Sequence, residues 1–543
     1  MSKQNEVLGK YQEVNLPKKE VAILEILESL LEEPIPKIDE IDFLAFGFLH
    51  ENGHVVSLAL YNKQLEILPD EIGGLQMLKE LYLGQNQLTY LPENLFTLHK
   101  LETLFLNWNK IKTLSDDISK LTLLKDLRLW ACGLTSLPDS ITKLQNLEML
   151  WLNNNEFGGL PNQIRNLKSL KSLVIYQLAL TELPEWIGEL SNLEYLGLAL
   201  NKLETLPKSI GKLKKLETIL LHFNEVSKLP DEIGELQNLK ELRLYHNKLS
   251  ALPETIGNLS NLEKLYVAVN PISSLPDTIG DLKNIQMISL LRCQFKLIPD
   301  TLGNLSTLKE LYIGENQLEV LPISLNKLKS LEKLGLQKNN FTKFPEQICG
   351  LAKLSFLDFS FNQISSLPEK FGELKNMFEL NLEGNELQSL PNSIEFLENL
   401  YTLKLSNNKL TSFPESIKGM KNLRLLDLYN NNLNSLPMNI WMLNELQVLY
   451  LGKNTLSDLP PGFHNLIKLQ ELSLNDNKFS SLPNVILRLK FLRNLHLHNN
   501  ELTELPETIN QMAGLRLLTI KNNSIDSKSK IIDELDKIGC LCI

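Results

Sequence analysis

Few residues of this chain have types and spacing that could support chemistry. His496 and His498 alternate along one predicted strand, and Asp476 lies about one repeat earlier. Imidazole and carboxylate groups are zinc ligands, but a zinc site needs at least three protein ligands that converge. A polar surface patch accounts for the same residues, and His222 and His246 on neighbouring predicted strands are interpreted in the same way. We therefore expect neither a metal nor another cofactor.

Sequence signatures of catalysis are also missing. The chain contains no Gly-x-Ser-x-Gly turn, no His-Glu-x-x-His helix and no Gly-x-x-x-x-Gly-Lys-Ser/Thr phosphate loop. Its cysteines are Cys132, Cys293, Cys349, Cys540 and Cys542, and no two of them form a Cys-x-x-Cys pair. Dispersed cysteines of this kind are typical of reduced, intracellular thiols. The sequence predicts a protein that is not an enzyme.

The last four residues, Cys540-Leu-Cys-Ile543, have the form of a Cys-a-a-X lipidation box. However, residue 542 is a cysteine rather than an aliphatic residue, and the charges just upstream are mixed rather than polybasic. An apolar strand that closes the end of the fold accounts for the same residues. We expect no membrane attachment unless Cys540 is lipidated.

Charge and hydropathy exclude further classes of protein. The net charge is −10, with acidic and basic residues interspersed, whereas a nucleic-acid surface needs a basic stripe. No run of about 18 apolar residues occurs, and the first residues lack the apolar segment of a secretory signal. We expect a cytoplasmic protein that does not bind nucleic acid.

The element that positions the remaining residues is a 23-residue repeat, which runs from about Val55 to about Asn523 without insertion or deletion. Proline marks this repeat, because it occupies every phased position from 69 to 506 except Ser115. Strict phasing over about 21 units indicates a solenoid, in which stacked units share one continuous core. Function must then be sought on the surfaces of the stack.

One unit can be read from Leu81 to Leu98. Leu81-Tyr-Leu83 alternates inward and outward, as a short strand does, and stacked units then form a parallel sheet. Apolar residues at every third position after Pro92 suit 3₁₀ turns or extended segments on the opposite side. The repeat therefore predicts a strand side and a 3₁₀ side.

Asparagine at the ninth position of each unit, 63 + 23k, is the second mark of the repeat. The chain leaves the strand there inside the core, and the side-chain amide can satisfy backbone groups that water does not reach. Four units depart from asparagine, with Lys63, Cys132, Leu178 and Cys293. We expect both cysteines to be structural, and we expect the asparagine ladder to be broken, or bridged by water, at Leu178.

Both ends of a solenoid need covering. A helix between Pro17 and Pro34 is predicted by apolar residues at helical spacing, namely Val21, Ile23, Leu24, Ile26, Leu27, Leu30 and Leu31. Residues 51–53 suit a hairpin turn into the first repeat strand. We predict an N-terminal helical cap over residues 1–54, repeats over 55–525, and a C-terminal helical cap with a closing strand over 526–543.

The form Leu-Pro-x-x-Ile-Gly-x-Leu-x-x-Leu, at Leu68–Leu78 and Leu206–Leu216, resembles the leucine-rich repeat superfamily. Within it, the repeats are similar to the intracellular Ras-group repeats of eukaryotes and to bacterial and archaeal leucine-rich repeats. The resemblance implies an α/β solenoid, a horseshoe or superhelical arc with a concave parallel β-sheet and a 3₁₀ or extended convex side. It also implies protein recognition on the concave face or its edges, with small GTPases and phosphatases among the partners of the Ras group.

The strand residues that face solvent are those that a partner can touch. In the first ten units they include many aromatic side chains, whereas small and charged residues dominate the later units. Aromatic residues and arginine are enriched in binding hot spots, although aromatic residues also suit strands in general. The predicted partner-binding residues are Tyr82, Phe105, Trp108, Arg128, Trp130, Trp151, Tyr176, Tyr195, His222, Phe223, Arg243, Tyr245 and Tyr266.

The sequence thus favours a non-catalytic scaffold that recognises a protein, such as a small GTPase or another signalling protein, through the aromatic N-terminal half of its concave face. Two alternatives remain open. One is an exported bacterial surface or effector protein that binds a host protein or glycan, and the other is a regulatory subunit of an enzyme. The pattern does not define the oligomeric state.

Overall fold

The computed structural model describes residues 8–512, 514–525, 530–537 and 540–542. They belong to two compact units, Met1–Asn270 (unit 1) and Pro271–Ile543 (unit 2). A strand, a turn and a 3₁₀ helix repeat throughout each unit, and this confirms the predicted α/β solenoid. Among the described residues, no helix is both long and apolar enough to cross a membrane.

Unit 1 begins with a cap in which β1 (Leu8–Tyr11) and β2 (Val14–Pro17) pair antiparallel. The helix that the sequence predicts follows directly as α1 (Lys18–Leu31). Most of its apolar residues are buried, whereas Leu30 is half exposed and does not widen the apolar face as expected. The helical spacing did not predict the β1–β2 hairpin.

The sheet of unit 1 starts at a hairpin. β3 (Phe46–Glu51) and β4 (His54–Leu60) are antiparallel around the predicted turn, and β4 pairs parallel with β5 (Glu80–Tyr82). Three-residue strands then recur every 23 residues up to β13 (Lys264–Tyr266). Neighbouring strands are in register at one repeat, so the inward-facing leucines of successive units stack into a continuous core.

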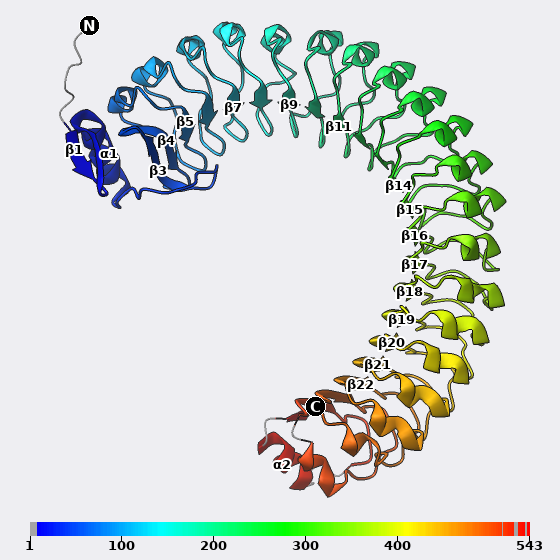
Figure 1. Cartoon of the computed structure of the whole chain (residues 1–543). Helices are drawn as coiled ribbons and strands as arrows, with labels where there is room; N and C mark the ends of the chain where they lie inside the picture. Colours follow the sequence, from blue (N-terminus) through cyan, green and yellow to red (C-terminus); the bar gives the residue numbers. More distant parts are fainter. Residues whose placement is uncertain (1–7, 513, 526–529, 538–539, 543) are drawn as a thin grey trace. The chain divides into compact units, whose positions relative to one another are not determined.

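Five-residue 3₁₀ helices follow the phased prolines of unit 1, from η1 (Asp70–Gly74) to η9 (Glu254–Asn258). Proline suits the position before them, because its missing N–H is not needed there. At η3 (Asp116–Lys120) Ser115 replaces proline, and its hydroxyl accepts a hydrogen bond from the Asp117 N–H. The one departure from proline is therefore a polar cap. Within the unit, strands lie along one edge and 3₁₀ helices along the other (Figure 1).

Unit 2 repeats the same pattern. Its strands run from β14 (Met287–Ser289) to β24 (Leu517–Thr519), and its 3₁₀ helices run from η10 (Asp277–Asp281) to η18 (Pro461–Asn465), η19 (Ile486–Arg488) and η20 (Glu507–Gln511). Strands and 3₁₀ helices again lie along opposite edges of the unit (Figure 1). The strand side and the 3₁₀ side predicted from the repeat are thus present in both units.

The predicted C-terminal cap over 526–543 lies partly outside the described residues. Within them, α2 (Lys530–Lys537) is helical and β25 (Leu541–Cys542) adds to β24 as a parallel strand. The Cys540 side chain is only 1% exposed. Within the described residues, the segment from Cys540 to Cys542 therefore packs against the end of the sheet, where a closing strand was predicted.

The asparagine ladder is present in both units. Asn86 is typical: its Oδ1 accepts from the Lys63 and Leu65 N–H groups at 3.0 Å each. Its Nδ2 donates to the Leu60 and Leu83 carbonyls at 2.7 and 3.0 Å. Each amide therefore joins its own unit to the preceding one and satisfies backbone groups inside the core.

The ladder adapts where asparagine is replaced. At Cys132 the thiol donates to the Leu106 carbonyl at 3.1 Å, and burial raises the pKa of Cys132 to about 12, which fits a structural thiol. The Leu178 side chain supplies no hydrogen bond, so the ladder lacks one rung there, as predicted. It resumes at once, because the Leu178 N–H donates to Asn201 Oδ1 at 2.9 Å. A cavity of about 300 Å³, lined in part by Gly158 and Ala179, lies beside the missing rung.

Candidate functional site

Each 23-residue repeat places four side chains on one face of the sheet. In the unit of β7 (Asp126–Arg128) they are Asp126, Arg128, Trp130 and Ala131. The fourth position lies in the left-handed region throughout unit 1, with φ between 53° and 58°. We call these side chains, from β4 to β13, the strand face of unit 1.

Large apolar side chains occupy several left-handed positions. Such a conformation costs a non-glycine residue of order 1–3 kcal/mol and persists only where the surrounding structure imposes it. Trp108 and Phe223 adopt it with φ of 55°, yet both remain 41% exposed. Burial therefore does not explain their presence, and the turn holds two aromatic rings rigidly toward solvent.

Two predicted site residues are not exposed. Tyr82 and Phe105 are 8% and 5% exposed, and their rings meet edge to face at 4.9 Å. Ile41 and Ala45, from the segment before β3, pack against them. The expectation that both rings face solvent is wrong, because this segment covers the first units of the strand face. Burial raises the pKa of Tyr82 to about 12.

Arg128 is held on three sides. Its guanidinium lies 4.1 Å from the Phe105 ring centroid and 4.0 Å from that of Trp151. Its Nη2 donates to Asp126 Oδ2 at 3.0 Å. Asp126 is only 5% exposed, and burial raises the pKa of this carboxyl while Arg128 opposes the change. Few rotamers of Arg128 remain to be lost when a partner binds.

Trp151 contacts this arginine, and two further tryptophans on neighbouring repeats contact each other. The rings of Trp108 and Trp130 lie 4.0 Å apart at 64°, and Tyr61 lies 6.5 Å from Trp108. The Trp151 Nε1 is shielded from solvent and has no hydrogen-bond partner among the described residues. We call Trp108, Arg128, Trp130 and Trp151 the tryptophan cluster. It combines apolar rings with a cation that is held in place.

A second group of rings lies further along the strand face. His222 stacks on Tyr245 with centroids 4.4 Å apart, and Phe223 stacks on His246 at 4.3 Å, both at 17°. Burial is the main reason that the pKa of His222 falls to about 4, so this ring is neutral at pH 7. We call His222, Phe223, Tyr245 and His246 the histidine–tyrosine cluster.

The remaining predicted residues flank this cluster. Tyr176 and Tyr195 bring their hydroxyl oxygens to 3.1 Å, and the Tyr176 ring covers Gly197, where a Cβ would lie 2.7 Å away. Arg243 is paired with Glu241 and lies 5.3 Å from the Tyr266 ring. The structure therefore gathers the predicted residues into several groups along the strand face.

The candidate metal ligands do not converge. His498 Nδ1 lies 2.9 Å from Thr519 Oγ1, and its Nε2 lies 3.9 Å from Asp476 Oδ2. His496 Nε2 lies 3.9 Å from Glu471 Oε1. Over the described part of the chain, no group of three or more potential ligand side chains could hold a metal ion.

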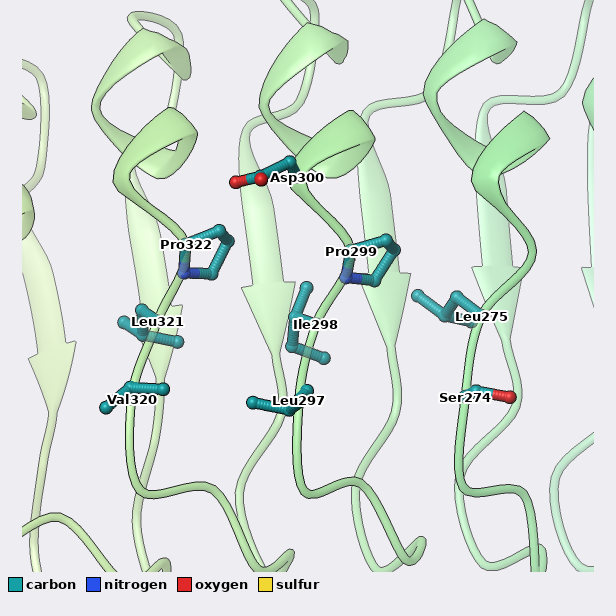
Figure 2. A pocket seen from close by; sticks show the side chains of 9 residues that line it. All are labelled: Ser274, Leu275, Leu297, Ile298, Pro299, Asp300, Val320, Leu321 and Pro322. Atoms are coloured by element: carbon teal, nitrogen blue, oxygen red, sulfur yellow. The ribbon is translucent and has the colours of Figure 1, made fainter.

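Unit 2 carries an apolar hollow that the sequence reading missed. Its volume is about 470 Å³, and Figure 2 shows Pro299 and Pro322 on adjacent turns above Leu297 and Val320. Leu297 and Val320 are 66% and 57% exposed. Most other units have serine, threonine or a charged residue at this position, and this contrast is the signal that could have identified the hollow.

Comparisons with known proteins agree with the fold. The family description "Leucine-rich repeat region" matches residues 112–194 and 184–271, and "Leucine rich repeat" matches 379–433 and 398–456. No curated protein sequence matches the chain. A leucine-rich repeat protein of Leptospira interrogans is 34% identical, covering 78% of this chain and 95% of that one, with a TM-score of 0.56.

Two structures of plant receptors are also similar. The Arabidopsis receptor kinase HAESA, in complex with the peptide hormone IDA and the co-receptor SERK1, is 26% identical over 90% of this chain and 86% of that one, with a TM-score of 0.62. The plant peptide hormone receptor RGFR1, in complex with RGF2, is 28% identical over 91% and 93%, with a TM-score of 0.52.

Proposed function

This chain belongs to the leucine-rich repeat family, and we propose that it is a non-catalytic scaffold that binds a protein or peptide through the strand face of unit 1. The observation that carries the proposal is that Trp108 and Phe223 are exposed and that each packs on a neighbouring ring of the strand face, Trp130 at 4.0 Å and His246 at 4.3 Å between ring centroids. Both rings remain exposed, and both belong to residues whose left-handed backbone is unfavourable for a non-glycine residue. Neither burial nor backbone preference therefore explains these residues. Solved complexes of similar receptors with peptide hormones support a protein or peptide as the class of partner.

The tryptophan cluster has the composition of a binding hot spot. Tryptophan, tyrosine and arginine dominate hot spots, where a few anchored side chains provide most of the affinity. Here Arg128 is already fixed between two rings and by Asp126, and Trp108 packs on Trp130. A partner therefore orders few side chains on binding, and this lowers the entropic cost of association.

The exposed ring of the same cluster is the one that a partner can touch. The Trp151 Nε1 is shielded from solvent, so Trp151 contributes its contact with Arg128 rather than a hydrogen bond to a partner. An apolar side chain of an extended segment would pack on Trp108, which is 41% exposed. The neutral His222 stacks on Tyr245, so this part of the histidine–tyrosine cluster offers ring contacts rather than charge.

The test compares two triple variants that change equivalent positions in the two units. Trp108→Ala, Trp130→Ala and Trp151→Ala remove the tryptophan cluster. Phe361→Ala, Tyr429→Ala and Tyr450→Ala remove aromatic rings from the same three positions on the strand face of unit 2. Partners are captured from lysate, identified, purified and titrated against each folded protein, and the panel includes small GTPases.

We expect the first variant to lose at least about 30-fold in affinity, since truncation at a hot spot costs about 2 kcal/mol or more, and the second to bind like the wild type. Equal losses in both variants, or unchanged binding in the first, would contradict the assignment of the site to unit 1.

A further inference from the structure

The residues that immediately precede the strands form a row, and their chemical type differs between unit 1 and unit 2. In unit 1 this row is charged, and neighbouring units form ion pairs such as Lys125–Glu102 at 2.6 Å and Lys240–Glu217 at 2.9 Å. At Phe378 and Tyr401 two successive units place aromatic rings in the row instead. Two rings therefore occupy positions whose equivalents in unit 1 carry charged side chains.

The two rings form an ordered stack. Their centroids are 4.9 Å apart at 26°, and the Arg424 guanidinium lies 4.9 Å from the Tyr401 ring. Arg424 Nη1 also donates to the Tyr401 hydroxyl at 3.4 Å. Phe378, at the open end of the stack, remains 46% exposed. The stack therefore ends in a flat apolar surface that faces solvent.

A row of side-chain amides runs beside the rings. Asn376, Asn399 and Asn422 each donate an Nδ2 hydrogen bond to a backbone carbonyl of the preceding unit, at 2.7, 3.0 and 2.8 Å. These bonds fix the amide orientation, so each Oδ1 is left as an acceptor. The next position holds Glu445, whose pKa is lowered by the hydrogen bond from Lys468, so that it remains ionised.

These residues line one pocket of about 510 Å³, a size within the range of small-ligand sites. We propose that this pocket, which we call the amide–aromatic pocket, binds a neutral saccharide. The apolar face of a sugar ring would pack on Phe378, its hydroxyls would donate to the amide oxygens and Glu445, and Arg424 would donate to a further oxygen. The site lies in unit 2 and is independent of the function proposed for unit 1.

The arrangement of charge and acceptors selects this class of ligand. Arg424 and Lys468 disfavour a cation, whereas the amide oxygens and Glu445 disfavour an anion, so an uncharged ligand is favoured. The amide acceptors recur once per unit, about 4.8 Å apart, which is the spacing of adjacent strands. An extended peptide presents N–H groups on one side only every second residue, about 6.7 Å apart, and matches this row poorly. A sugar ring carries several hydroxyl donors within the shorter distance.

Calorimetric titration of the full chain with maltotriose, cellotriose and N,N′,N″-triacetylchitotriose, all of them neutral, tests the proposal. The variant Phe378→Leu keeps apolar volume but removes the flat ring, and Glu332→Ala changes the same row two units away as a matched control. We expect at least one trisaccharide to bind, with affinity at least about tenfold weaker in Phe378→Leu and unchanged in Glu332→Ala. The thermal midpoint of each variant establishes that it is folded.

Three outcomes would overturn the proposal. The first is that no trisaccharide binds the wild type at millimolar concentration. The second is that Phe378→Leu binds as tightly as the wild type, which would show that ring stacking contributes nothing. The third is that a proline-rich peptide, titrated in parallel, binds at this pocket while the sugars do not.

Discussion

Replacing Asn201 by alanine should destabilise this protein more than the same change at neighbouring rungs. Asn201 Oδ1 accepts from the Leu178 and Leu180 N–H groups at 2.9 and 3.1 Å, and its Nδ2 donates to the Ile175 carbonyl at 2.8 Å. Because residue 178 is leucine, no preceding amide shares the Ile175 carbonyl. Asn201→Ala therefore leaves three buried backbone groups without these partners.

Asn224 provides the matched comparison one unit later. Its Oδ1 accepts from the Leu203 N–H at 3.0 Å. Its Nδ2 donates to the Leu198, Leu221 and His222 carbonyls. Each of these keeps another donor, namely Asn201, Asn247 and the Leu200 N–H respectively. Asn224→Ala therefore leaves only one backbone group unpaired.

A buried polar group without a partner costs about 1 kcal/mol at the lower end of measured values. Three groups against one predict a loss of about 3 kcal/mol for Asn201→Ala and about 1 kcal/mol for Asn224→Ala. Long repeat arrays need not unfold in a single step, so the local opening free energy is the quantity to measure. Native-state hydrogen exchange over residues 172–226 provides it, with urea unfolding as a second measurement. Equal losses, or a larger loss at Asn224, would refute this account of the ladder.

Two further predictions concern buried titratable groups. Burial raises the pKa of the Cys132 and Cys349 thiols from 9.0 to about 12, so the unfolded chain loses these protons first as pH rises. Stability should then fall between pH 9 and pH 12, by up to about 1.4 kcal/mol per pH unit for each thiol. Urea midpoints measured from pH 8 to 10.5 should fall less steeply in a Cys132→Ala, Cys349→Ala double variant, and identical slopes would argue against the thiols. Arg128→Ala should cost about 3 kcal/mol, because it leaves the buried Asp126 carboxylate unpaired. Replacing Asp126 by alanine as well should recover most of that loss in urea unfolding, and a purely additive double variant would disprove the coupling.

The repeat itself was predictable because each core position has one physical role. A residue such as Asn86 is defined by the backbone groups it must satisfy, and proline marks where no N–H is needed. Even the exceptions follow the same logic, since Ser115 caps a 3₁₀ helix and Leu178 removes one rung. The periodic pattern was therefore sufficient to predict almost the whole fold.

The surface was harder to predict, because it depends on contacts between segments without a shared pattern. Nothing in the spacing of Ile41 and Ala45 indicates that they pack on Tyr82 and Phe105, so these two rings were expected to face solvent. The amide–aromatic pocket did leave a signal. Phe378 falls in a row that is charged in most earlier units, but the signal is visible only when the units are compared row by row.

The asparagine ladder has a direction. Each amide serves the backbone of the unit before it, as Asn86 does for Lys63 and Leu65, so a unit is completed only by the one that follows. During synthesis the N-terminal units emerge first. The newest unit on a growing chain therefore keeps unpaired polar groups in its turn until another 23 residues have been added. The growing stack therefore has the helix Lys18–Leu31 at its first end and a turn with unpaired polar groups at its last repeat. A truncation at the C-terminal side of any repeat would leave these groups unpaired in the final protein.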